Sequence, residues 1–354
     1  MLLHRLLLSS RPHLARPIRK HYRIHEREYY RKGVTIVTHT IKTLLFLLPA
    51  ISVMSTQALP FQPEDVQIKT IQVAKGIYML QGQGGNIGVS AGQDSLFIID
   101  DQFAPLTEKI TAVITALAAR PVQFVLNTHW HGDHTGGNEN FGKAGALIVA
   151  HDNVRRRMSV EQFMEAFNRR VPASPKEALP VVTFSERVTF HLNQDHIHAY
   201  HVEPAHTDGD SEIHFHHANV FHMGDLFFNG SYPFIDLSSG GSFTGMLAAV
   251  EGVLEKADGN SKIIPGHGEL ATRQELVAYR DVLKAVKERV SKLIAEGKSL
   301  EQVLETQLTA EFDETWGAGF MNPQTFLTIV LQPWACSPAA RGLWRRKARR
   351  RTRC

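Results

Sequence analysis

Cysteine is nearly absent from this chain of 354 residues, and the two that occur, Cys336 and Cys354, both lie close to its C-terminal end. The rest of the chain therefore has neither a disulfide framework nor a metal site built from thiolates. A long uninterrupted hydrophobic run is also missing. The apolar stretch at residues 43–54 is broken by Pro49 and is too short for a comfortable membrane span, so we expect no stable membrane insertion.

That apolar stretch has instead the order of a secretory signal. Lys42 precedes it, and small residues follow it up to Ala58. We therefore predict a signal-like segment at residues 34–58, cleavage after Ala58, and export to the periplasm or the outside of the cell. A membrane anchor and an internal helix are the alternatives.

Acidic residues are scarce at both ends of the chain. Residues 1–58 and 333–354 hold 18 of the 39 Lys and Arg but only 2 of the 35 acidic residues, so residues 59–332 carry a net charge of −12. We expect residues 1–33 and 333–354 to be basic, disordered ends around one folded domain at 59–332. Because an acidic surface repels backbone phosphates, we expect no nucleic-acid partner.

Histidine, by contrast, is abundant, and one run concentrates it. Three histidines and an aspartate occupy six positions after the apolar stretch at residues 122–127: His129, His131, Asp133 and His134. At the end of a strand His129 and His131 can point to one side, while Asp133 and His134 turn to another. The spacing therefore predicts one loop that serves two metal ions. A histidine-rich surface loop is the alternative.

The hydrophobic periodicity indicates two similar halves in which strands precede mixed strands and helices. Strands are expected at 66–73, 76–81, 87–89, 95–99, 122–127, 146–150, 187–191, 196–202, 212–217, 220–223 and 262–265, and helices at 105–119, 153–168, 243–257 and 273–295. We expect an α/β fold with four layers, in which two mainly antiparallel sheets face each other and helices cover both outer faces.

Three later fragments place a histidine or an aspartate in a glycine-containing turn after a short strand. They are centred on His206, Asp225 and His267. Loops at strand ends are where functional sites are commonly built. Imidazole nitrogen and carboxylate oxygen are also ligands that zinc accepts.

The ordered set His129-x-His131-x-Asp133-His134, His206, Asp225, His267 resembles the metallo-β-lactamase superfamily over about residues 67–330. The resemblance implies an αβ/βα sandwich, in agreement with the layers expected from periodicity. It also implies that His129, His131 and His206 hold one metal ion, that Asp133, His134 and His267 hold the second, and that Asp225 bridges them.

From this resemblance we expect a zinc-dependent hydrolase with two Zn²⁺ ions, although iron or manganese would suit an oxygen bridge. A hydroxide shared by the two ions would attack the acyl group of a small-molecule ester, thioester, lactone or β-lactam. The best-known lactamase subclass has cysteine where this chain has Asp225, and aspartate there resembles the thioesterases and lactonases of the superfamily. Asp225 could alternatively accept hydrogen bonds from backbone amides.

Residues near the expected metal ions allow two interpretations each. Asn229 and Tyr232 could donate a hydrogen bond to a developing oxyanion or could only shape their loop. Trp130 could line the pocket or pack in the core. The helix expected at 153–168 could cover the site as a flap or face the core. Asp101 and Asp210 are expected to have structural roles, such as orienting ligand imidazoles.

Further histidines alternate along the expected strands of the second half: His191, His196, His198, His201, His214, His216, His217 and His222. We expect most of them to be exposed or hydrogen-bonded. An accessory metal patch is the alternative.

Two other functions remain open. One is a phosphodiesterase or nuclease of the same superfamily, which the acidic domain disfavours. The other is a metal-binding or di-iron redox accessory protein without hydrolytic activity. The sequence does not indicate the physiological substrate or the oligomeric state.

Overall fold

The computed structural model describes residues 62–335. The expected N-terminal extension and signal-like segment lie outside the described residues, as does the C-terminal tail from residue 336 onward. The last described helix, α9 (Pro323–Ala335), ends beyond the domain boundary expected at residue 332. Between residues 62 and 335, every helix is too short or too polar to cross a bilayer.

The first sheet has seven strands in the order β1-β2-β3-β4-β5-β6-β9. Their bounds are β1 (Lys69–Ala74), β2 (Ile77–Gln81), β3 (Ile87–Ala91), β4 (Leu96–Ile99), β5 (Phe124–Leu126), β6 (Leu147–His151) and β9 (Val182–Phe184). Neighbouring strands from β1 to β4 are antiparallel, whereas those from β4 to β9 are parallel. The expectation of a mainly antiparallel sheet is therefore wrong for this half.

The parallel part of the sheet follows from the helices that connect its strands. A parallel pair needs a crossover, and these crossovers contain α1 (Thr107–Leu117), then α2 (Gly132–Thr135) and α3 (Asn138–Lys143). The apolar side of α1 packs through Ile110 and Ile114 on the outer face of the sheet. The helix expected at 105–119 thus provides one outer layer.

The second sheet has six strands in the order of the chain. They are β10 (Arg187–Leu192), β11 (Asp195–His201), β12 (Ser211–Phe215), β13 (Val220–His222), β14 (Lys262–Ile264) and β15 (Ala271–Thr272). Only the β13–β14 pair of this sheet is parallel, and its crossover contains α5 (Phe243–Lys256). The sheet is mainly antiparallel, as expected.

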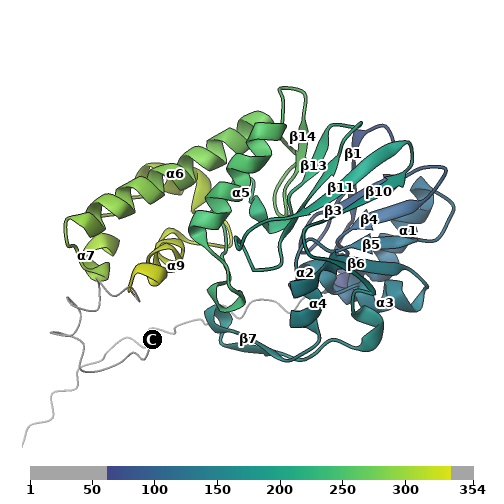
Figure 1. The fold of residues 1–354 in the computed structure, drawn as a ribbon, viewed down its shortest axis with the longest axis horizontal. Coiled ribbons are helices and arrows are strands. Elements are labelled where there is room, and N and C mark those ends of the chain that lie inside the picture. The colour runs from purple at the N-terminus through teal and green to yellow at the C-terminus, as the bar shows by residue number, and fades with distance from the viewer. Residues whose placement is uncertain (1–61, 336–354) are drawn as a thin grey trace, which may run out of the picture. The chain divides into compact units, whose positions relative to one another are not determined.

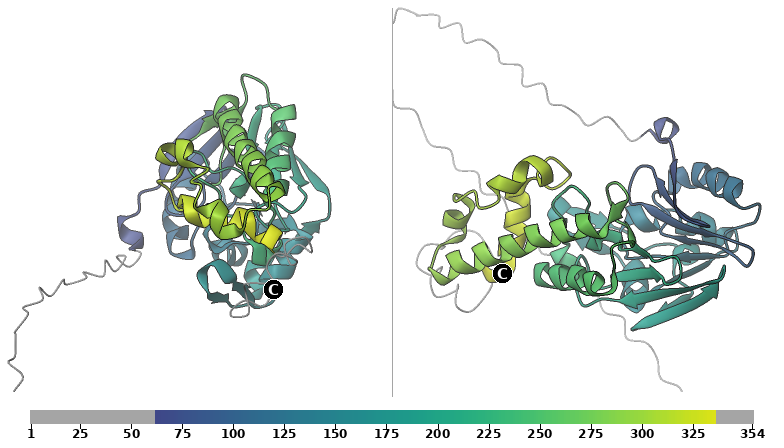
Figure 2. Two further views of the ribbon diagram at one scale, coloured as in Figure 1. Left: turned by 90° about the vertical axis from the view of Figure 1, so that its left-hand side faces the viewer. Right: turned by 90° about the horizontal axis from the view of Figure 1, so that it is seen from above.

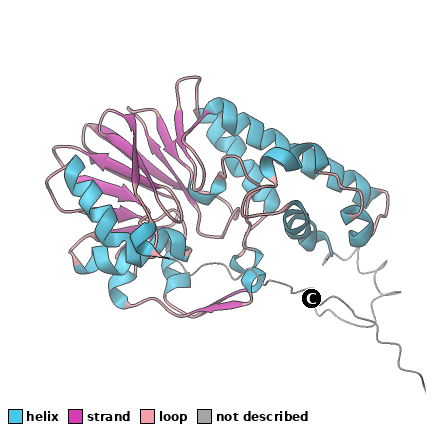
Figure 3. Ribbon diagram, turned by 180° about the vertical axis from the view of Figure 1, so that it is seen from behind, coloured by secondary structure: helices cyan, strands magenta, loops and turns pink. Residues whose placement is uncertain are grey.

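The two sheets pack face to face around an apolar layer. Phe97 and Leu126 of the first sheet belong to the same buried cluster as Ile197 and Phe215 of the second. On the outer side of the second sheet, α5 packs beside α6 (Arg273–Ala295) (Figures 1 and 2). Strands with helices on both sides are visible in Figure 3. The four-layer α/β sandwich is confirmed.

The long helix α6 begins and ends where the sequence predicts. Thr272 and Glu275 form a capping box at its start, which satisfies backbone amides that the helix itself leaves unpaired. Three further helices follow it: α7 (Leu300–Leu304), α8 (Ala310–Trp316) and α9. Apolar side chains of this C-terminal region join the cluster beneath α5 and α6, so it belongs to the same domain core.

The prediction of a helix at 153–168 is wrong for the second half of this range. The helix α4 (Asp152–Met158) is followed by a hairpin of β7 (Gln162–Met164) and β8 (Arg169–Val171). Asn168 turns the hairpin with a φ of 48°, in the left-handed region that asparagine tolerates better than most residues. The apolar spacing from Met158 to Phe167 therefore reflects a helix joined to a hairpin.

Candidate metal centre

The predicted metal ligands lie on four loops that follow β5, β11, β13 and β14. The early histidine run begins in the loop after β5 and continues into α2, and the other three loops carry His206, Asp225 and His267 respectively. Because β13 and β14 are parallel, their carboxyl ends deliver Asp225 and His267 to the same edge of the second sheet. Both sheets thus contribute loops to a single site.

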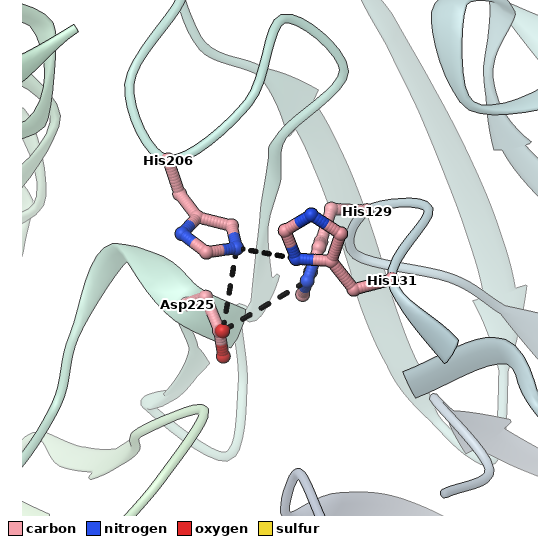
Figure 4. Close-up of side chains that lie close together, drawn as sticks. All are labelled: His129, His131, His206 and Asp225. Atoms are coloured by element: carbon pink, nitrogen blue, oxygen red, sulfur yellow. Dashed lines mark hydrogen bonds and ion pairs between the residues drawn. The ribbon is translucent and has the colours of Figure 1, made fainter. Parts of the chain in front are cut away.

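The structure brings all seven predicted residues together in two neighbouring groups. Group one consists of His129, His131, His206 and Asp225, and group two consists of Asp133, His134 and His267. In each group, candidate ligand atoms of all members lie within 4.8 Å of one another. Figure 4 shows His129 and His206 facing the Asp225 carboxylate, with His131 beside His206.

Asp225, a member of group one, also contacts group two. Its Oδ2 atom faces group one, at 3.4 Å from His206 Nε2 and 3.9 Å from His129 Nε2. Its Oδ1 atom faces group two, at 3.0 Å from His134 Nε2 and 3.3 Å from His267 Nε2. One carboxylate therefore presents an oxygen atom to each group.

Hydrogen bonds fix which nitrogen each imidazole of group one presents. His206 Nδ1 donates to the carbonyl oxygen of Phe234 at 2.8 Å, which leaves Nε2 facing the group. His131 is held by its Nε2 atom, which lies 3.0 Å from Asp236 Oδ2, and presents Nδ1 at 2.9 Å from His206 Nε2. Partners on the far nitrogen orient metal-ligating histidines in the same way.

In group two, Asp100 orients the imidazole of His134, whereas the sequence analysis considered this role for Asp101 and not for Asp100. Asp100 Oδ2 accepts from His134 Nδ1 at 2.8 Å, and Oδ1 accepts from the backbone amide of Thr128, also at 2.8 Å. Asp101 instead accepts from the backbone amide of Gly137. The position of Asp100 directly after β4, at a strand end, was the available signal.

The Asp210 carboxylate accepts hydrogen bonds from a loop that carries a predicted ligand. Its Oδ2 atom accepts from the backbone amides of His206 and Thr207, at 2.6 and 2.8 Å. Burial raises the pKa of Asp210 to about 7, against the lowering effect of these hydrogen bonds. The expectation of a structural role for Asp210 agrees with this geometry.

The electrostatics differ between the two groups. In group two the carboxylates of Asp225 and Asp133 outweigh burial, so they raise the pKa of His267 to about 9 and that of His134 well above its usual value, whereas group one favours neutral imidazoles. Burial lowers the pKa of His206 to about 4 and holds that of His129 well below its usual value. Burial alone would raise the pKa of Asp225, but the imidazoles around it, His134 first, hold it well below its ordinary range. His129 Nε2 is buried and makes no hydrogen bond within the described part of the chain. A bound cation would give this nitrogen a partner. Without one, burial of its lone pair costs free energy.

Glycine is required where the backbone passes close to these side chains. A Cβ atom on Gly85, in the loop between β2 and β3, would overlap the ring of His134. A Cβ atom on Gly266 would crowd Asp225 Oδ1. Gly85 thus lets a loop of the first sheet approach His134, and Gly266 lets a loop of the second sheet approach Asp225.

Three aromatic or amide residues expected near the site have other partners. The Tyr232 ring stacks on Phe326 of α9 at 4.5 Å between centroids, and its hydroxyl donates to Asp313 Oδ1 at 2.8 Å. The Asn229 amide donates to the carbonyl oxygen of Glu269, so it ties two loops together. Trp130 is buried and donates to Ser239 Oγ. We therefore assign packing and loop-shaping roles to these residues, in place of the oxyanion binding considered for Asn229 and Tyr232.

An aromatic surface borders group one, and the segment expected at 153–168 contributes to it. The buried Phe234 ring lies 6.0 Å from the His131 ring and 5.7 Å from the His206 ring, between centroids. Phe167 and Phe320 contact Phe234 at 5.1 and 6.4 Å and are 43% and 70% exposed. Phe167 lies beside the β7–β8 hairpin, so this segment contributes to the rim of the site.

Comparisons with known proteins agree with the geometry. The sequence profile of the Metallo-beta-lactamase superfamily matches residues 85–267, about half of the chain. A solved metallo-beta-lactamase from Pontibacter korlensis is similar in structure, with a TM-score of 0.52 and 16% identity, over 62% of this chain and 99% of that one. The sec-alkylsulfatase Pisa1 from Pseudomonas sp. is similar with a TM-score of 0.57 and 16% identity. That match covers 78% of this chain but only 51% of the sulfatase, and at such low identities both likenesses concern the fold alone.

Proposed function

This chain belongs to the metallo-beta-lactamase superfamily, and we propose that it is a hydrolase that uses two metal ions to cleave an acyl bond of a small molecule. The observation that carries the proposal is the position of Asp225, whose two oxygen atoms face two separate donor groups. Such an arrangement suits a carboxylate shared by a pair of cations. The substrates we propose are esters, thioesters, lactones and β-lactams.

The donor set fits divalent cations that accept nitrogen and oxygen ligands. His129, His131 and His206 would hold one ion, Asp133, His134 and His267 the second, and Asp225 both. Zn²⁺ binds such sets, and iron or manganese also accepts a carboxylate bridge. When bound, the ions would supply Lewis acidity and a nucleophile derived from water at neutral pH.

The remaining residues of the site position and enclose the reacting groups. Asp236 and Asp100 hold His131 and His134 in fixed orientations through short hydrogen bonds. Phe234 shields one side of group one from water and offers an apolar contact to the substrate. We infer that the acyl group binds beside this ring.

Metal analysis and a substrate panel test this function on the full-length protein. The panel contains a p-nitrophenyl ester, a thioester, a lactone, nitrocefin, a sec-alkyl sulfate and bis(p-nitrophenyl) phosphate. We expect two metal ions per chain and turnover of at least one acyl substrate. A preference for the phosphate diester would favour a nuclease or phosphodiesterase. Two bound ions without turnover of any compound would favour a metal-binding or redox accessory protein.

Substitution of one group-one histidine links the metal ions to the activity. His131→Ala should lose metal and turnover together, because it removes a donor of group one and the partner of Asp236. His216→Ala is the matched control, since His216 is exposed and belongs to neither donor group. Full turnover by a metal-depleted His131→Ala protein would refute the proposed function.

We also propose that the protein is exported. The support is the order of Lys42, the apolar stretch and the small residues before Ala58 in the sequence. Expression of the full chain in a bacterium, followed by N-terminal sequencing of the periplasmic fraction, tests it. A mature protein that begins at Leu59 is expected, and an uncleaved cytoplasmic product would overturn export.

A further inference from the structure

A lattice of histidines covers part of one face of the second sheet, away from groups one and two. His191 of β10 is paired with His196 of β11, and the backbone amide of His216 donates to the carbonyl oxygen of His196. These three histidines therefore form one row from β10 and β11 to the residue that follows β12. In the next row, on the same face, β11 and β12 pair His198 with His214.

The face that carries this lattice points away from the core between the sheets. Ile197 and Ala199, which alternate with these histidines along β11, are buried in the apolar layer. The histidines at the open side of the lattice, by contrast, are exposed: His191, His196, His216 and His217. His217 lies two residues beyond the end of β12, and its ring is 4.8 Å from that of His196 in the first row.

The rings of this lattice are as closely spaced as those of group one. Ring centroids in group one lie 4.8 Å apart for His129 and His131, and 4.6 Å apart for His129 and His206. In the lattice, the His196 ring lies 4.7 Å from that of His191 and 4.8 Å from that of His217. His196 is thus the centre of a trio in which its own two ring contacts have the spacing found in group one.

The ring nitrogens of the trio do not point toward one common position, whereas the ligand atoms of groups one and two do. Exposed side chains change rotamer readily, so a cation can draw them together at small cost. His216 adds another ring, 5.5 Å from that of His217. The strands beneath are fixed by backbone pairing on both sides of β11, which keeps the side chains on one face.

The second row favours neutral imidazole, the form that binds metal. Burial, followed by the neighbouring histidines, lowers the pKa of His198, and burial lowers that of His214 to about 4. His198 Nδ1 lies 3.0 Å from Thr189 Oγ1, so its Nε2 atom remains for a ligand. The nearest cations on this face, Arg187 and Lys256, lie toward the other end of the strands, beside Tyr200.

We propose that this lattice is an accessory site for one transition-metal ion with a preference for imidazole, centred on His196 and completed by His191 and His217. The site is separate from the two groups described above and does not depend on the proposed hydrolase function. Zn²⁺, Cu²⁺ and Ni²⁺ are the cations that imidazole clusters bind well. Occupancy would join β10, β11 and the end of β12 from the solvent side.

Calorimetric titration with Zn²⁺, after removal of metal from the full-length protein, tests this site. The double variant His196→Asn/His217→Asn removes two of three donors and leaves both catalytic groups intact. We expect it to bind one ion fewer per chain than the wild type, or to bind that ion with affinity reduced on the order of tenfold or more. Tyr200→Phe, a change on the same face without a ligand role, should bind as the wild type does.

A second variant separates this site from the catalytic groups. Asp225→Asn should weaken Zn²⁺ binding in groups one and two but leave Zn²⁺ binding at the accessory site. Adding His196→Asn/His217→Asn to Asp225→Asn should abolish this remaining binding. Circular dichroism should show that each variant keeps its fold. Equal Zn²⁺ stoichiometry and affinity in the wild type and in the folded His196→Asn/His217→Asn variant would overturn the proposal.

Discussion

Asp100 shows how a single residue can order the metal centre without belonging to either donor group. Its φ of 62° places it in the left-handed region, which costs energy for most side chains. In this conformation its carboxylate accepts hydrogen bonds from both the backbone amide of Thr128 and the ring of His134. It therefore couples the start of the histidine loop to the orientation of a predicted ligand.

Replacement of Asp100 by asparagine tests this coupling. Asparagine tolerates the left-handed backbone but lacks the charge that strengthens the bond to His134, so we expect metal affinity at group two to fall about 10- to 100-fold. Competition with a chromophoric chelator measures this affinity. Asp101→Asn is the control, because Asp101 accepts from a backbone amide and not from an imidazole. Equal losses in both variants would show that burial, and not orientation of His134, is the cause.

The sequence could identify the seven clustered residues because each class of side chain stands in a recognisable local setting. Histidines two apart at a strand end, and His206, Asp225 and His267 in glycine-containing turns, are local patterns. The contacts of Asp100 and Asp236 could not be predicted in the same way. Asp236 lies 105 positions from His131 in the chain, and only the folded sheets bring the two together.

At the scale of elements, Tyr232 belongs to the packing of the C-terminal helices. Its ring stacks on α9 and its hydroxyl reaches Asp313 of α8. Tyr232→Phe keeps the stack and removes one hydrogen bond, so we expect a loss of about 1 kcal/mol in the free energy of unfolding and an unchanged kcat. Urea denaturation and steady-state kinetics measure the two effects. A large fall in kcat at unchanged stability would restore the oxyanion role.

Prediction of elements succeeded where periodicity was sustained and failed where it was short. The 23-residue helix α6 has a continuous apolar stripe and a capping box, and its bounds could be read from the sequence. Residues 153–168 have apolar residues at helical spacing too, but hairpin pairing of β7 with β8 replaces the helix after Met158. Strand pairing depends on a partner segment, which a local pattern does not contain.

At the scale of the whole molecule, the stability of the domain should depend on pH through a stacked histidine pair. The rings of His151 on β6 and His201 on β11 lie 3.6 Å apart and nearly parallel, so they join the two sheets. Burial, and then the charge of His201, lowers the pKa of His151 below the 6.5 of an unperturbed imidazole. The contribution of His151 is therefore fully present above pH 6.5 and is lost as the pH falls below it.

His201→Phe should make this acid loss smaller, because a phenyl ring keeps the stack but never gains a charge. Urea midpoints at pH 8 and pH 5 measure the slope. The hydrogen bond from His201 to the carbonyl oxygen of Asp210 is also lost, which shifts stability at both pH values alike. A slope as steep as that of the wild type would contradict the role of the pair.

The shared position of Asp225 has a thermodynamic consequence. A cation bound to one oxygen of Asp225 changes the affinity of the other oxygen for the second cation, so the two binding events should be coupled. By linkage, each ion changes the affinity of the other by the same factor. A calorimetric titration of groups one and two should then depart from two independent sites. In Asp225→Asn the departure should vanish, and group one and group two should each bind an ion independently of the other.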